Sequence, residues 1–501
     1  MIYLLFFLFS LIATNPFPDI NLNKEHTKSL NHGDFNKNNS TYSKYKEKFI
    51  DELFKRRVFP IKLNDTINNE KANSTSFITV KTTQTAPTLS GPEYLLDYNY
   101  VDILTQFPAY GTASVQPWSG YYWPHRYGIL SARYSLDSKN SMCVIQNNQI
   151  TQWYTYYQSV NMYSQPNENN NVKRYGKSYY NQYVNAYYSP SEKIDLLFGD
   201  PNFSLTNYMK SQGYQYMTNN DIPSWLGLCN GWAPASYLEP RCNKSVTITA
   251  YDNVTQITFL PDDLEALATL FYAQSSYNIK MVGNRCSDTS DTSCTIMNAG
   301  VFVIVIANQI GIRKENLIFE PKVDSEIWNF PAFAYTFQFY SPLQRSNRQY
   351  SYTLTWDMLL PPSSISSSSD SLFIKAKQSS SYSYTSYYTG TRLCIKYTGE
   401  DYPYHSDAVW DDTIGEYCYD IVLALSSEYK VIDGFWDQED IPTYMWTPQN
   451  KESIMGVYDG YVTEFDGTSE DIARVRPYAI YSARRGTVLK KVMEFLINAS
   501  Q

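Results

Sequence analysis

Cys229 stands where the sequence predicts the start of a helix. The run Ser224–Pro240 reads SWLGLCNGWAPASYLEP, and its turn-like Gly-Leu-Cys-Asn-Gly precedes residues that favour a helix. Unpaired backbone N–H groups and the positive end of the helix dipole favour a thiolate at such a position. The same N–H groups can stabilise an oxyanion during acyl transfer. The pattern therefore predicts either a nucleophile for acyl transfer or a small buried core residue.

A cysteine nucleophile needs a base, which is usually a histidine oriented by a carboxylate or an amide. The chain has four histidines: His26, His32, His125 and His405. The first two stand in a predicted tail, and the other two are interpreted as surface or packing residues. No sequence pattern places any of them beside Cys229. The sequence also contains no phosphate loop, zinc spacing or EF-hand loop, so we predict no cofactor and no metal.

The chain has seven cysteines, and an odd count leaves at least one thiol without an intramolecular partner. One set of pairs that leaves Cys229 free is Cys286 with Cys294, Cys394 with Cys418, and Cys143 with Cys242. The first pair would close a short loop, and the second lies on neighbouring predicted strands. Seven positions allow many other connectivities.

Composition limits the class of protein. Aromatic residues make up 16% of the 501 residues, charged residues make up 18%, and the net charge is −8. So many aromatics and so few charges exclude a disordered charged polymer. The negative charge argues against nucleic acid as the main partner, since no excess of cations exists to contact phosphates. The length predicts two or three domains.

The N-terminal region predicts secretion. Residues 1–17 resemble a signal peptide, because 2–13 are apolar except Ser10 and polar sequence follows. The alternative, a membrane anchor, is less favoured because about 12 apolar residues fall short of the roughly 20 that a spanning helix needs. Glycosylation sequons support an extracellular location. They stand at Asn38, Asn39, Asn64, Asn73, Asn202, Asn243, Asn253 and Asn498.

The remaining chain is divided by composition and periodicity. Residues 18–89 are predicted to be an Asn-, Lys- and Ser-rich flexible tail or propeptide. We predict a cysteine domain over 90–345, a β-rich domain over 346–465, and a C-terminal segment over 466–501 that contains an amphipathic packing helix. Pro261–Ala273 predicts a helix and Gly300–Asn308 a buried strand. Further strands are predicted at Tyr350–Trp356, Leu372–Lys377, Arg392–Tyr397 and Tyr417–Leu425.

Several segments, in order, resemble the transglutaminase elicitor family of secreted oomycete transglutaminases and their bacterial relatives. Trp225–Pro240 (WLGLCNGWAPASYLEP) is similar to the family's active-site segment, and Ile327–Pro331 (IWNFP) to its elicitor-peptide motif. Other similar segments are Pro117–Pro124, Ser189–Asp200, Ile257–Ala273, Gly283–Cys286, Asn298–Gly311 and Tyr417–Pro448. The resemblance implies an α+β fold, with a papain/transglutaminase-like cysteine domain followed by a β-rich domain.

The resemblance also implies an activity: Cys attack on a glutamine carboxamide, loss of ammonia, and transfer to a lysine amine. Cys229 takes the nucleophile position, and Trp232 belongs to the same active-site segment. Val303 stands where the family has its catalytic His, and Glu320 stands at the position of the acidic partner. Losing a base can remove several orders of magnitude of rate, so we predict impaired or absent transfer.

Two functions remain open. One is a secreted aminoacyltransferase that crosslinks extracellular or cell-surface protein, using a substitute base such as His125 or His405. The other is a non-catalytic secreted structural or interaction protein on the same scaffold, whose tyrosines make contacts. A cysteine protease would also lack the required His. In every case we predict an extracellular protein partner, no nucleic acid, and no membrane-spanning segment after signal removal.

Overall fold

The computed structural model describes residues 88–134, 143–146, 149–153, 188–215, 222–286, 296–404 and 411–501. All of the described residues belong to one compact unit. The predicted signal peptide, most of the predicted tail, and His26, His32, His405 and Cys294 lie outside the described residues. Among the helices of the described ranges, none combines the length and hydrophobicity needed to cross a membrane.

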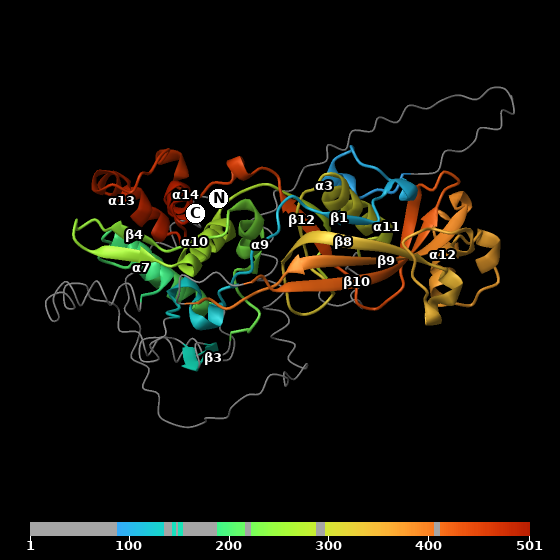
Figure 1. Cartoon of the computed structure of the whole chain (residues 1–501), viewed down its shortest axis with the longest axis horizontal. Coiled ribbons are helices and arrows are strands. Elements are labelled where there is room, and N and C mark those ends of the chain that lie inside the picture. The colour runs from blue at the N-terminus through green and yellow to red at the C-terminus, as the bar shows by residue number, and fades with distance from the viewer. Residues whose placement is uncertain are drawn as a thin grey trace, which may run out of the picture. The chain divides into compact units, whose positions relative to one another are not determined.

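An antiparallel sheet is the largest element of the described chain (Figure 1). Its strand order is β11-β10-β9-β8-β7-β12-β6, and β1 pairs with β8. The strands are β1 Tyr110–Thr112, β6 Ile279–Gly283, β7 Leu317–Phe319, β8 Phe330–Tyr340, β9 Tyr387–Thr398, β10 Ile414–Leu425, β11 Val431–Trp436 and β12 Tyr444–Pro448. Two further strand pairs are β2 Cys143–Gln146 with β3 Gln149–Trp153, and β4 Val246–Thr249 with β5 Gln256–Phe259.

The helices contribute to distinct clusters of buried side chains. One cluster joins α7 Pro190–Leu197, α8 Ser204–Gln215, α9 Cys229–Leu238, α10 Pro261–Gln274, α13 Ser469–Ala483 and α14 Lys490–Ala499. A second cluster joins the sheet to α3 Glu93–Leu96 and α11 Ala299–Ile306, and a third contains α12 Ser371–Gln378. The arrangement is a mixed helix and sheet fold.

Short helical turns connect these elements. The 3-10 turns are η1 Leu104–Gln106, η2 His125–Tyr127, η3 Ile129–Ser131, η5 Pro342–Asn347, η6 Trp356–Met358, η7 Pro362–Ile365, η8 Tyr382–Tyr384, η9 Lys451–Ser453 and η10 Asp459–Tyr461. One π-helical segment, η4 Ala307–Ile312, continues α11.

Local sequence signals explain the helices that were predicted. Helix α10 begins with Pro261, and the Asp263 carboxylate accepts a hydrogen bond from the backbone N–H of Leu260 at 2.8 Å. Helix α14 buries Val492 and Leu496 in the helical cluster, as predicted for a packing helix. The predicted strands Arg392–Tyr397 and Tyr417–Leu425 lie within β9 and β10.

The predicted strand at Gly300–Asn308 is wrong, because this run forms α11 and the beginning of η4. Asn298 caps the helix by accepting a hydrogen bond from the N–H of Gly300 at 2.8 Å. The apolar run is buried on every side and therefore has no periodicity that separates helix from strand. Gly434 in β11 lies against the start of this helix, because a Cβ at Gly434 would fall 2.1 Å from the backbone nitrogen of Gly300. This close approach packs the helix onto the sheet.

Two other predicted strands are also wrong. Leu372–Lys377 forms α12, since the Asp370 carboxylate caps it and Leu372, Phe373 and Ala376 are buried on one face. Tyr350–Trp356 makes one isolated bridge at Ser351 and then enters η6. The predicted split into a papain-like domain and a β-rich domain is not confirmed, and the predicted domain boundaries remain predictions. Strands from both sides of residue 345 pair in the same sheet.

Candidate functional site

Cys229 is the first residue of α9, as the sequence predicts, and its thiol is free and buried. The preceding residue, Leu228, provides no side-chain cap, so the first N–H groups of α9 receive no side-chain hydrogen bond from it. Gly231 lets α9 lie against α10, because a Cβ at this glycine would fall 2.1 Å from the carbonyl oxygen of Thr269. The helix that carries the thiol is therefore packed tightly in place.

The ends of four strands of the sheet lie near the start of this helix. Strand β7 ends before Glu320, β8 begins after Asn329, β9 ends shortly before Glu400, and β12 begins after Thr443. Because neighbouring strands run antiparallel, these chain positions come together at the same end of the strands. The sheet thus brings an amide and two carboxylates toward the thiol from segments far apart in the sequence.

Asn329 holds the sulfur in a fixed environment. Its Nδ2 donates a hydrogen bond to Cys229 Sγ at 3.5 Å, and the sulfur donates to the carbonyl oxygen of Ile327 at 3.8 Å. The Oδ1 of Asn329 accepts hydrogen bonds from Trp446 Nε1 at 2.9 Å and from the Tyr444 hydroxyl at 3.3 Å. These two donors require the oxygen to face them, which turns the amide NH₂ toward the sulfur. Neither contact of the sulfur is an imidazole.

The environment disfavours the thiolate. Burial raises the pKa of Cys229 to about 11, the Asn329 N–H lowers it, and the charges of Glu400 and Glu320 raise it further. At pH 7 a thiol with that pKa is ionised in roughly one molecule in ten thousand. Burial therefore outweighs the favourable helix terminus that the sequence suggested.

Glu320, the predicted acidic partner, lies near Cys229 but has another set of contacts. It is buried, and its Oε2 accepts a hydrogen bond from the Thr443 hydroxyl at 3.1 Å. Burial raises the pKa of Glu320 to about 8, while the positive charge of Arg285 lowers it. Near neutral pH the carboxyl is therefore largely protonated.

Val303 and Cys229 belong to different clusters of buried side chains. Val303 lies inside α11 and is fully buried in the cluster of the sheet, whereas Cys229 packs in the helical cluster. His125, the histidine that the structure describes, is buried in η2, and burial lowers its pKa to about 4. It is a neutral packing residue at pH 7.

Trp232 is fully buried and ties α9 to an aromatic segment. Its Nε1 donates a hydrogen bond to the carbonyl oxygen of Trp118 at 3.3 Å, and Trp118 Nε1 donates to the carbonyl oxygen of Glu239 at 3.1 Å. These two hydrogen bonds join α9 and the residue after it to the segment that contains Trp118. Trp232 positions the helix and does not contact the sulfur through these bonds.

The cysteine predictions have mixed outcomes. Cys394 and Cys418 form a disulfide, as predicted. The predicted Cys143–Cys242 pair is wrong, because Cys242 is a free thiol buried near Ser500 at the end of the chain. Cys286 is disulfide-bonded, and Cys294 lies outside the described residues, so that pairing stays a prediction.

Sequence reasoning missed Asn329, Glu400 and Trp446 as functional residues. Asn329 and Trp446 do stand in segments named above, Ile327–Pro331 and Tyr417–Pro448, but no local pattern assigns them to a thiol. No sequence pattern marks Glu400 as a site residue, because its place near the thiol depends on where β9 ends in the folded sheet.

One family model overlaps several of the segments named above. The family model for the transglutaminase elicitor matches residues 209–359. A solved structure, the GP42 transglutaminase from Phytophthora sojae, is similar at 15% sequence identity with a TM-score of 0.44, covering 76% of this chain and 94% of that chain. No curated protein matches the chain. Over residues 209–359, the chain is therefore similar to the transglutaminase elicitor family.

Proposed function

We propose that this chain is a secreted transglutaminase-like protein that binds an extracellular or cell-surface protein and in which Cys229 does not carry out ordinary aminoacyl transfer. The observation that carries the proposal is the state of the thiol. Its pKa is raised to about 11 by burial, and its polar contacts are an amide and a carbonyl. A transferase of this kind needs a thiolate and a base that removes and returns a proton.

The surrounding carboxylates do not take the place of the imidazole that the sulfur lacks among its described contacts. A negative Glu320 or Glu400 raises the pKa of the thiol, whereas a protonated histidine would lower it. At the position where the family has its His, Val303 is fully buried within α11. A buried valine needs no polar partner, and it has no group that could accept a proton at this position.

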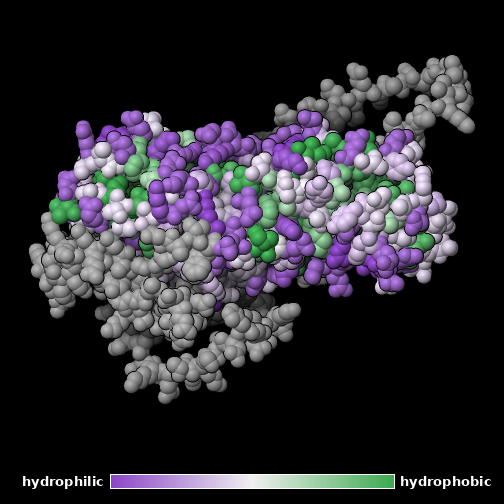
Figure 2. All heavy atoms as spheres, viewed as in Figure 1, coloured by the Kyte–Doolittle hydropathy of each residue, from purple (hydrophilic) through white to green (hydrophobic). Residues whose placement is uncertain are grey.

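The surface supports a binding role. Several large aromatic residues are exposed, including Tyr98, Tyr110, Trp356 and Tyr461. Such side chains offer large amphipathic contact area at low entropic cost, and they are enriched at protein interfaces. On the face drawn in Figure 2, hydrophobic residues stand in separate small groups among hydrophilic ones. This mixture is typical of a transient rather than an obligate interface.

The Cys394–Cys418 disulfide supports the extracellular part of the proposal, since such bonds persist in oxidising compartments. The apolar segment at residues 2–13 supports it as well.

The test measures incorporation of a labelled primary amine into a glutamine-bearing protein. We expect the same background signal from the full chain and from the Cys229→Ala variant, with matching circular dichroism spectra and melting temperatures. Incorporation by the natural chain that disappears in Cys229→Ala would overturn the proposal and favour a transferase with a substitute base.

A further inference from the structure

A pocket of about 360 Å³ opens at the strand ends described above. Cys229 does not line it, but Trp328, which does, stands between the two residues that contact the sulfur. Four carboxylates line it: Glu320, Asp324, Glu326 and Glu400. One cation, Lys322, lines it as well, and its Nζ is already paired with Asp324 at 2.7 Å. The pocket therefore has an excess of carboxylates over cations.

The carboxylates differ in how well their oxygens are satisfied. Glu326 accepts a hydrogen bond from Trp328 Nε1 at 3.0 Å, and Glu320 accepts one from Thr443. Glu400 is different, because its Oε1 is fully buried and has no hydrogen-bond partner among the described residues. A buried carboxylate oxygen without a donor is costly, so a hydrogen-bond donor that reaches it gains free energy.

Four aromatic side chains line another part of the pocket: Trp328, Phe330, Tyr397 and Tyr417. The rings of Trp328 and Phe330 are stacked at 6.3 Å with an interplanar angle of 13°, and those of Tyr397 and Tyr417 at 5.2 Å with 19°. Phe330 joins the two stacks, since its ring lies 4.6 Å from that of Tyr397. The faces of such rings carry negative potential and attract cations.

We propose that this pocket binds the guanidinium group of an arginine side chain on a partner protein, with Glu400 accepting its N–H groups and the aromatic rings stacking on its plane. The proposal deepens the proposed function, because it names the chemistry of the partner, and it does not depend on the reactivity of Cys229. Both the charge and the shape of the pocket contribute to this assignment.

A guanidinium fits better than an ammonium for two physical reasons. It is planar and weakly hydrated, so it stacks on rings and enters a buried site at a lower desolvation cost than a compact, strongly hydrated ammonium. Its five N–H donors lie in a rigid fork, which allows one group to serve Glu400 Oε1 and a second carboxylate at once.

The experiment titrates the full chain with N-acetyl-arginine amide and follows binding by calorimetry. N-acetyl-lysine amide tests charge without the planar fork, and N-acetyl-citrulline amide tests the shape without charge. Free L-arginine tests whether the pocket binds the free amino acid rather than an arginine side chain of a protein. We expect saturable binding of the arginine amide, at least tenfold weaker binding of the lysine amide and of free arginine, and no binding of the citrulline amide.

Two variants separate the pocket from general charge effects. Glu400→Gln removes the unpartnered carboxylate, and we expect it to weaken arginine binding at least tenfold. Glu464→Gln makes the same change at an exposed residue away from the pocket and is expected to leave binding unchanged. If Glu400→Gln does not fold by circular dichroism, Tyr417→Leu is used instead, because it removes one ring of the stacked pair.

Several results would overturn the assignment: no saturable binding to the natural chain, equal binding of the lysine or citrulline amide, tighter binding of free arginine, or unchanged binding by the pocket variants. These results are separable from the labelled-amine test. If the chain neither binds the arginine amide nor incorporates the labelled amine, only the pocket assignment is contradicted. If it binds the arginine amide but also incorporates the amine through Cys229, only the proposed loss of transfer is contradicted.

Discussion

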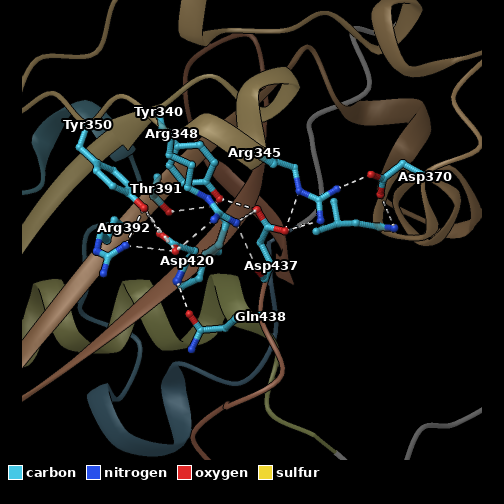
Figure 3. A network of polar contacts seen from close by, with 12 residues as sticks. Tyr340, Arg345, Arg348, Tyr350, Asp370, Thr391, Arg392, Asp420, Asp437 and Gln438 are labelled. Atoms are coloured by element: carbon cyan, nitrogen blue, oxygen red, sulfur yellow. Dashed lines mark hydrogen bonds and ion pairs between the residues drawn. The ribbon is translucent and has the colours of Figure 1, made fainter.

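Strand β8 connects two clusters of buried acidic residues that differ in their pairing. At its Phe330 end lies the pocket with Glu320 and Glu400, where Glu400 has an oxygen without a partner. At its Tyr340 end lies a network around Asp420 and Asp437, shown in Figure 3. The same sheet thus contains a cluster whose charges are matched and another whose charges are not.

In the network around Asp420 and Asp437, arginines face both carboxylates. Asp437 accepts hydrogen bonds from Arg345 Nε at 2.6 Å and from Arg348 Nη2 at 2.8 Å, and also from the Tyr340 hydroxyl at 2.8 Å. Asp420 lies 3.3 Å from Arg392 Nη1. In Figure 3 these side chains converge from separate strands and from the segment after β8. Such matched charges fix the fold and leave little attraction for a ligand.

In the pocket, the carboxylates are buried with fewer opposing charges. Burial raises the pKa of Glu320 to about 8 and that of Glu400 well above its ordinary value. Burial also raises the pKa of Asp420, but Arg392 and Arg348 oppose that shift. The comparison teaches that buried acids on one sheet stabilise the fold only where cations accompany them. Unaccompanied acids reduce stability when they ionise, and a bound cation would favour their ionised form.

Glu320→Gln should give the largest change in stability. The Glu320 carboxyl titrates near 4.3 when unfolded and at about 8 when folded. Between those values the unfolded state has lost the proton and the folded state has kept it, so stability falls as pH rises through this window. Removing the acid should therefore raise the free energy of unfolding at pH 8, by on the order of 2–4 kcal/mol.

Urea unfolding at pH 5 and pH 8 checks this sign. The gain should be small at pH 5 and large at pH 8. A variant that is destabilised equally at both pH values would show that Glu320 is paired like the acids of the network, and the contrast between the clusters would fail.

The reactivity of Cys229 should be the next largest effect. With a pKa of about 11, alkylation by iodoacetamide should rise about tenfold for each pH unit from pH 7 to pH 10 without a plateau. A free cysteine levels off above its pKa of about 8.5. Subtracting the signal of Cys229→Ser removes the contribution of Cys242. A plateau below pH 8 would mean that a positive group activates the thiol.

Asp437→Asn should destabilise the protein, opposite in sign to Glu320→Gln. The change leaves Arg345 and Arg348 without their shared carboxylate, although both guanidinium groups are about a quarter exposed. We expect a loss of about 2 kcal/mol in the free energy of unfolding, which is below the cost for a fully buried pair because water reaches these groups. Thermal and urea unfolding measure it. Glu494→Gln, which breaks the exposed pair with Lys491, is the control and should cost less than about 1 kcal/mol.

Local signals predicted parts of the fold well. The turn before Cys229 and the Pro261 helix start are set by residues within one or two turns, so α9 and α10 could be read directly. The apolar run at 300–308 could not, because burial on all sides removes the polar positions that would reveal its period. The alternation predicted part of strand β9, but its pairing with β8 joins residues fifty or more positions apart.

The candidate site divides in the same way. The sequence by itself determined a cysteine at a helix N-terminus and a chain with four histidines. That Val303 takes the position of a catalytic His stays a prediction from the resemblance. Only the tertiary structure decided the chemical state of that thiol. Its amide partner lies 100 residues away, and the nearby carboxylates arrive at the ends of β7 and β9. Burial and distant charges set a pKa, and these quantities exist only once the chain has folded.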